Sequence, residues 1–150
     1  MPRIERRAQV AWDGNVARGR GAITAATSGA FSELPFSMPT RIGEAEGKTS
    51  PEELLAAAHG GCLTMSLASE LTQAGTPPGR LDVTCTIVMD EVEGQGHQIV
   101  ASRVEAIAEA DGLDADGLAA ALAAADEGCP FSALLRRAGA DVQVDARLAS

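Results

Sequence analysis

The stretch that decides the fold covers residues 50–62 and reads SPEELLAAAHGGC. It has the pattern of a helix start. Ser50 suits the N-cap, Pro51 suits the first helical position, and Glu53 can complete a capping box with Ser50. Apolar and small residues then continue until a group of Gly and Pro residues follows. The sequence therefore predicts a helix from about Pro51 to Ala74.

This helix is predicted to be apolar on nearly every side, with almost no polar face before Glu70. Its apolar residues are Leu54, Leu55, Ala57, Ala58, Leu63, Met65, Leu67 and Ala68. A surface helix keeps one polar side, so this pattern is typical of a helix buried in a core or in a subunit interface. We expect it to be the central helix of the fold.

Strands are predicted on both sides of the central helix, together with a second helix. The expected strands cover residues 7–12, 21–26, 81–89, 99–109 and 141–148, and the second helix covers 114–127 and ends at Gly128. The first two strands form a hairpin around Asp13-Gly14-Asn15. Cys85 is expected on the buried face of the third strand. Residues 28–48 show no period and are predicted to be a long irregular connection, which contains Arg41.

Composition limits the classes of function. The chain has 150 residues, 45% of them hydrophobic, and a net charge of −9. The negative charge disfavours binding to nucleic acid, whose phosphates need basic side chains. The sequence has no apolar run long enough for a membrane span, no apolar leader and no Gly-rich phosphate motif. We predict one soluble α+β domain over residues 1–150, in the reducing cytoplasm, with small neutral substrates and neither a membrane nor a nucleic-acid partner.

Cys62 and Cys129 suggest thiol chemistry. The chain has three cysteines, too few for a disulfide scaffold, so any disulfide is expected to be catalytic. Taken alone, Cys62 is typical of a small core residue, and Cys129 is equally typical of a helix end before the stop proline Pro130. As a pair, they also fit an attacking thiol and its resolving partner. The cysteines alone leave both interpretations open.

Several motifs along the chain resemble the OsmC/Ohr family of organic hydroperoxide reductases, and its OsmC branch in particular. They are Trp12-Asp13-Gly14, Arg18-Gly19-Arg20-Gly21, Thr40-Arg41, the stretch 50–62 and Gly128-Cys129-Pro130-Phe131-Ser132. The resemblance implies an OsmC-like α+β fold, with antiparallel sheets around a central buried helix, in an intertwined homodimer. It implies that Cys62 is the peroxidatic cysteine and Cys129 the resolving cysteine. Arg41 and Glu53 match an arginine and a glutamate of the family's active site.

Reduction of a peroxide by a thiol makes three chemical demands. A thiolate must attack one oxygen, a cation must keep the sulfur ionised, and a second thiol must capture the sulfenic acid. The start of the central helix is too far away to help, because Cys62 lies roughly 16 Å beyond Pro51 at 1.5 Å per residue. Burial alone raises the pKa of a thiol. We therefore expect Arg41 to activate Cys62 and Cys129 to resolve it, without a metal or cofactor.

Glu53 is not expected to reach Cys62 of its own chain. Nine residues of helix place the two side chains on opposite sides and about 13 Å apart along the axis. Glu53 either orients the arginine in the site of a partner subunit or only completes the capping box with Ser50. The resemblance favours the first role, and the two roles can coexist.

The sequence thus predicts a thiol-dependent peroxidase that reduces organic hydroperoxides to alcohols, through a Cys62 sulfenic acid and an intramolecular disulfide. The family resemblance suggests a small dithiol, such as a lipoyl group, as the reductant. The alternative is a noncatalytic homodimer that binds an apolar ligand and has structural cysteines. Residues that could line an apolar site are Phe31, Leu34, Phe36, Met38 and Phe131, although such residues more often pack on the core.

The remaining candidates are expected to be structural. His59 lies one turn from Cys62, but these two residues and Cys129 give fewer than the four ligands that are usual for zinc. Cys85 has no polar neighbours on the buried face of its strand, and His97 lies in a loop.

Overall fold

The computed structural model describes residues 1–150, which form two compact units, Met1–Pro51 and Glu52–Ser150. No single helix in the chain is long and apolar enough to cross a membrane. Only the bent pair of helices at 115–128 and 130–137 passes that test, by combined length and composition.

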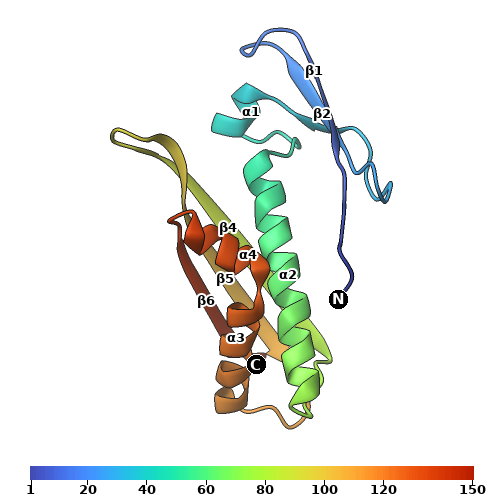
Figure 1. Ribbon diagram of the computed structural model, residues 1–150, viewed down its shortest axis with the longest axis vertical. Helices are drawn as coiled ribbons and strands as arrows, with labels where there is room; N and C mark the ends of the chain where they lie inside the picture. The colour runs from blue at the N-terminus through green and yellow to red at the C-terminus, as the bar shows by residue number, and fades with distance from the viewer. The chain divides into compact units, whose positions relative to one another are not determined.

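The N-terminal unit is a three-stranded antiparallel sheet followed by a short helix (Figure 1). Its elements are β1 Gln9–Asp13, β2 Arg20–Thr24, β3 Leu34–Phe36 and α1 Met38–Ile42. The predicted hairpin is confirmed, and Gly14 in its turn has φ of 90°, which glycine adopts without a steric penalty.

The prediction of an irregular connection over residues 28–48 is wrong for its middle part, residues 34–42. β3 pairs with β2 there, and α1 follows directly. Ser37 caps α1 by accepting a hydrogen bond from the N–H of Thr40, and a proline lies in the first turn. These are ordinary helix-start signals, but the segment is too short to show a helical period.

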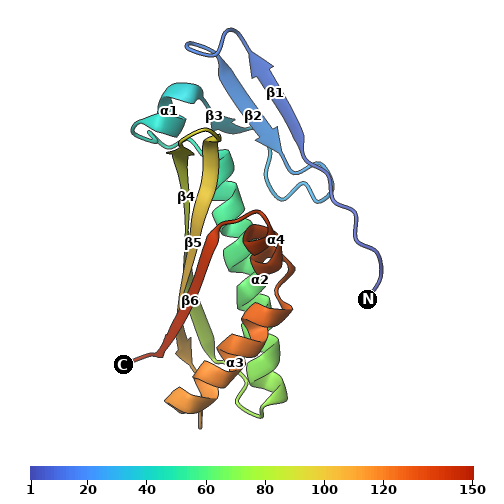
Figure 2. The same cartoon turned by 60° about the vertical axis from the view of Figure 1, so that its left-hand side comes forward.

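The C-terminal unit carries both candidate thiols. Its elements are α2 Pro51–Gln73, β4 Arg80–Val92, β5 Gly96–Glu109, α3 Ala115–Gly128, α4 Pro130–Arg137 and β6 Asp141–Leu148. The strands form one sheet in the order β4-β5-β6, and Figure 2 shows all three helices on one face of it. The predicted α+β class is confirmed. β4 and β5 form an antiparallel hairpin, whereas β6 runs parallel to β5 because α3 and α4 form the crossover between them.

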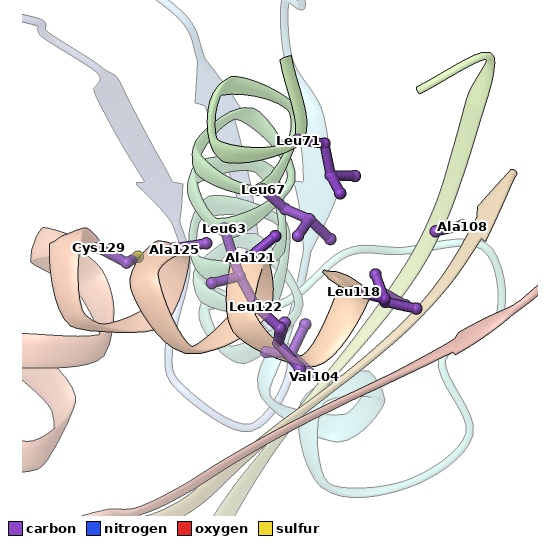
Figure 3. Packing of buried hydrophobic residues seen from close by; sticks show 11 residues of the cluster. Leu63, Leu67, Leu71, Val104, Ala108, Leu118, Ala121, Leu122, Ala125 and Cys129 are labelled. Atoms are coloured by element: carbon purple, nitrogen blue, oxygen red, sulfur yellow. The ribbon is translucent and has the colours of Figure 1, made fainter. Parts of the chain in front are cut away.

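The core lies between α2, α3 and the inner face of β5 (Figure 3). Leu63, Leu67 and Leu71 project from one side of α2, because residues four apart share a helix face. They pack with Val104, Ala106 and Ala108 of β5 and with Leu118, Ala121, Leu122 and Ala125 of α3. Burial of each leucine contributes about 1.5–3 kcal/mol. This packing fixes the position of α2 and therefore of Cys62, which directly precedes Leu63.

In the single chain, α2 is buried on one side only. The other side carries Glu53, Ala57, Gly61 and Met65 at intervals of four residues, and all four are exposed. Met65 is 71% exposed. The predicted central helix is therefore present, but an apolar strip of it is left without a cover within the chain.

Candidate active site

Cys62 and Cys129 meet in the C-terminal unit. Cys62 is half-buried on α2, and Cys129 is fully buried where α3 meets α4. The thiol of Cys129 is close enough to Cys62 to raise the pKa of Cys62, and both residues pack in the same core cluster. Neither is in a disulfide. Two free thiols that lie close together are the arrangement that an attacking and a resolving cysteine need.

The position of Cys129 follows from the two helices that meet there at an angle of 64°. The N–H of Cys129 donates to the carbonyl of Asp126, which closes α3. Its Sγ accepts a hydrogen bond from the N–H of Ser132 at 3.5 Å, which opens α4. Pro130 ends α3 as expected, but it also begins α4, because proline is favoured in the first turn of a helix. The sequence therefore gives no clear sign of α4, since the same proline can end one helix and begin the next.

The surroundings of Cys62 within this unit favour the neutral thiol. Burial raises the pKa of Cys62, and the hydrogen bond and charge of Cys129 raise it further. Hydrogen bonds with the backbone of Phe131 and the side chain of Ser66 act in the opposite direction, but the pKa stays above its ordinary value. None of these groups is a cation. Attack on a peroxide therefore needs a positive charge from elsewhere.

The backbone of Phe131, which lowers the pKa of Cys62, is a source of partial charge that the sequence does not indicate. Phe131 lies in the first turn of α4, where backbone N–H groups have no partner within the helix and carry partial positive charge. The start of α4 therefore favours the thiolate form of Cys62. Its effect is too small to overcome the groups that raise the pKa.

Arg41 lies in the last turn of α1, in the N-terminal unit. It lines a hollow of about 50 Å³ together with Trp12, Phe36, Ser37, Met38 and Pro51. The rings of Trp12 and Phe36 are 5.6 Å apart. Arg41 is thus next to apolar side chains, two of which were candidates for an apolar site. Phe131 packs against the core cluster instead. The action of Arg41 on Cys62 stays a prediction.

Glu53 is exposed in the first turn of α2. It lines a groove of about 620 Å³ between α2 and β4, and Gly60, Gly61 and Cys85 also line this groove. Cys62 does not line this groove, and α2 is continuous from Glu53 to Cys62. The prediction that Glu53 cannot reach Cys62 of its own chain therefore agrees with the structure.

His59 has a larger role in the structure than the sequence suggested. It is fully buried, with Nδ1 2.7 Å from Oγ of Ser102 and Nε2 2.8 Å from Oγ of Ser132. Serine hydroxyls therefore occupy both ring nitrogens, which leaves neither of them for a metal ion. No three potential ligands gather anywhere in the chain. The sequence gives no signal for this arrangement, because the two serines come from β5 and α4.

The family model for OsmC-like proteins matches residues 43–145. This chain belongs to the OsmC-like family. Over 147 residues it is 33% identical to the peroxiredoxin OsmC of Escherichia coli, which covers 98% of this chain and 99% of that protein.

Solved structures share the fold of this OsmC-like chain. An organic hydroperoxide resistance protein from Elizabethkingia anophelis has a TM-score of 0.73 and 21% identity, and the match covers 99% of this chain and 100% of that one. OhrB of Bacillus subtilis has a TM-score of 0.69 and 24% identity, over 94% and 98%. An OsmC-like protein of unknown function from Vibrio cholerae has a TM-score of 0.79 and 14% identity, over 97% and 100%. At these identities the similarity shows the fold.

We expect this OsmC-like protein to lose stability when the pH falls below about 6.5, the ordinary histidine pKa that His59 has in the unfolded chain. Burial lowers the pKa of His59 in the folded chain, Asp126 raises it and Arg136 lowers it, with a net decrease. Cys85 is the other titratable group at the ring. Because the unfolded chain binds the proton first, the stability from neutral His59 is complete above about 6.5. It is lost as the pH falls toward the folded value, by at most about 1.4 kcal/mol per pH unit.

Urea unfolding between mildly acidic and neutral pH measures this effect. A His97→Gln variant is the matched control, because it removes the only other histidine and should keep the wild-type dependence of the free energy of unfolding on pH. In a His59→Gln variant, the free energy of unfolding should no longer fall with pH in this range. If the free energy of unfolding of His59→Gln still falls with pH as in the wild type, the pH dependence comes from other groups.

Proposed function

We propose that this OsmC-like protein is a thiol-dependent peroxidase that reduces organic hydroperoxides to alcohols. The observation that carries the proposal is that the free thiols of Cys62 and Cys129 lie close together, in one packed core cluster. The names of its relatives support a peroxide as the substrate, since one is a peroxiredoxin and two others are organic hydroperoxide resistance proteins. We place the protein in the cytoplasm, where a reducing environment keeps cysteines as thiols and returns a catalytic disulfide to thiols.

In the proposed reaction, the Cys62 thiolate attacks the terminal oxygen of the hydroperoxide. The O–O bond breaks, the alkoxide leaves and takes up a proton to form the alcohol, and Cys62 becomes a sulfenic acid. Cys129 then attacks this sulfur, a hydroxide leaves and is protonated to water, and a disulfide forms. Two electrons thus pass from the thiol pair to the peroxide. A small dithiol of the lipoyl class returns them by thiol–disulfide exchange.

Arg41 is proposed to supply the positive charge that this chemistry requires. The groups near Cys62 in the C-terminal unit raise its pKa, so the thiolate needs a cation. A guanidinium also donates paired hydrogen bonds, which suit the oxygens of a peroxide and of a departing alkoxide. The reaction needs neither a metal nor a cofactor.

Titration with tert-butyl hydroperoxide tests the proposed function. One equivalent added to the reduced protein should consume the thiols of Cys62 and Cys129, and peptide mapping should find a disulfide between them. Cys85 should stay free, and a Cys62→Ser variant should not react. Loss of no thiol, or a disulfide that contains Cys85, contradicts the assignment. The first of these results favours a noncatalytic protein that binds an apolar ligand.

We also propose that the protein is an intertwined homodimer, in which Glu53 contributes to the partner's active site. The apolar strip on α2 that includes Ala57, Gly61 and Met65 has no cover in the single chain. Gly61 has open space at the position of a Cβ, although glycine costs about 1 kcal/mol relative to alanine within a helix. Close approach of a second chain gives a reason for that glycine. Glu53, which cannot reach its own Cys62, lies at the end of the same strip.

A further inference from the structure

A hydrogen-bonded network of buried polar side chains runs through the core of the C-terminal unit, beside the two thiols. At its centre is His59, bonded to Ser102 through Nδ1 and to Ser132 through Nε2. Cys85 extends this network at one end, with Sγ 3.5 Å from Oγ of Ser102. Asp126 lies near the other end, where Ser132 helps to lower the pKa of its carboxyl group. His59, Ser102 and Ser132 are fully buried, so each bond is costly to break.

Asp126 lies close to this network and influences the pKa of His59. It forms a bidentate ion pair with Arg136, with its shorter contact at 2.6 Å, so its carboxylate is charged. A neutral imidazole has one N–H donor and one acceptor nitrogen, so one of the two serine hydroxyls accepts from the ring of His59 and the other donates to it. Both serine side chains are therefore held by the same ring.

His59 and Ser132 each lie one helical turn from a thiol. His59 precedes Cys62 by three residues on α2, and residues three apart are neighbours on a helix. Ser132 follows Cys129 by three residues on α4, and its N–H donates to Sγ of Cys129. The bond between His59 and Ser132 therefore joins the two thiol-bearing helices directly beside the thiol pair.

We infer that His59, acting through Ser132, is a positioning residue that holds Cys129 in place for capture of the oxidised Cys62. This inference rests on the proposed function and extends it to the resolving step. A disulfide forms only within a narrow range of Cα separation and dihedral angle, so a small shift of α4 relative to α2 slows closure. Slower closure leaves the sulfenic acid exposed to a second peroxide, which converts it to sulfinic acid.

Ser132→Ala and Ser102→Ala form a matched pair of variants for the test. Each removes one buried hydroxyl that is bonded to the ring of His59. In Ser102→Ala, Sγ of Cys85 stays 3.9 Å from Nδ1, so the free energy of unfolding is measured for both variants. Only Ser132→Ala breaks the link to α4. Single-turnover oxidation with tert-butyl hydroperoxide should show an unchanged rate of Cys62 oxidation in both. Closure of the disulfide should be about tenfold slower or more in Ser132→Ala alone.

Mass spectrometry under excess peroxide gives the second readout. Ser132→Ala should accumulate Cys62 sulfinic acid, whereas Ser102→Ala and the wild type should not. Closure at the wild-type rate in Ser132→Ala, or equal slowing in both variants, overturns the inference. If Ser132→Ala does not fold, a triple variant with His59→Leu, Ser102→Ala and Ser132→Ala removes the whole link without leaving a buried partner unpaired. It should show the same slow closure.

Equilibration with a glutathione redox buffer separates this inference from the proposed function, because it needs no peroxide. It measures the effective concentration of Cys129 at Cys62, which should fall about tenfold or more in Ser132→Ala and stay near the wild-type value in Ser102→Ala. A protein that passes this test but does not react with hydroperoxide would disprove the proposed function and keep the positioning role. Equal effective concentrations in both variants would overturn the positioning role and leave the proposed function in place.

Discussion

Arg41→Ala is expected to slow the oxidation of Cys62 by an organic hydroperoxide by about 10²-fold, the usual effect of removing one charged stabiliser from an active site. The C-terminal unit raises the pKa of Cys62 through burial and through Cys129, so little thiolate forms without a cation. The loss should be largest at neutral pH. It should shrink as the pH rises, because hydroxide then ionises the thiol and only the contribution to the departing alkoxide is missing.

Stopped-flow measurement of the second-order rate, together with the thiolate absorbance of Cys62 against pH, tests both parts of this prediction. Arg41→Lys should be less impaired, because it keeps the charge and loses the paired hydrogen bonds. Arg3→Ala is the matched control, since it removes an exposed arginine of the same unit that pairs only with Glu5 on the surface. If Arg41→Ala keeps the wild-type rate and thiolate titration, arginine has no part in the mechanism.

The sequence predicted α2 within one residue, because Ser50, Pro51 and Glu53 form a start signal and the apolar residues then repeat without a break. Longer strands were equally readable from their alternation, and the inward set of β6, which includes Val142 and Val144, has the expected burial pattern. The missed elements, β3, α1 and α4, are short. A strand of three residues and helices of five and eight residues are too short to show a clear period, and a proline can indicate either a stop or a start.

The site was predictable only in part, for a related reason. Cys62 and Cys129 were found as a pair because their motifs match a family, and the structure brings them together. His59 was underestimated, since its partners Ser102 and Ser132 are 43 and 73 residues away and only tertiary packing selects them. A histidine in an apolar helix gives no indication of which distant hydroxyls it will meet.

The open strip on α2 leads to the second large effect, which is rescue between two inactive chains. Glu53→Ala and Cys62→Ser are each expected to have little activity. In a mixed dimer in which Glu53 serves the partner's site, one site lacks both groups and the other has both. Unfolding the two variants together and refolding them should therefore restore activity toward half the wild-type value per mixed dimer. Light scattering should show dimers throughout.

The control for this experiment uses the two thiols, which the structure brings together within a single chain. Cys62 and Cys129 lie close together in the same chain, so mixing Cys62→Ser with Cys129→Ser creates no site with both thiols intact and should give no gain over the parents. If the Glu53→Ala mixture shows no more gain than this control, Glu53 acts within its own chain or only caps α2. If both mixtures gain equally, the effect comes from refolding. Rescue in the first mixture alone requires Glu53 to act across the interface between two chains.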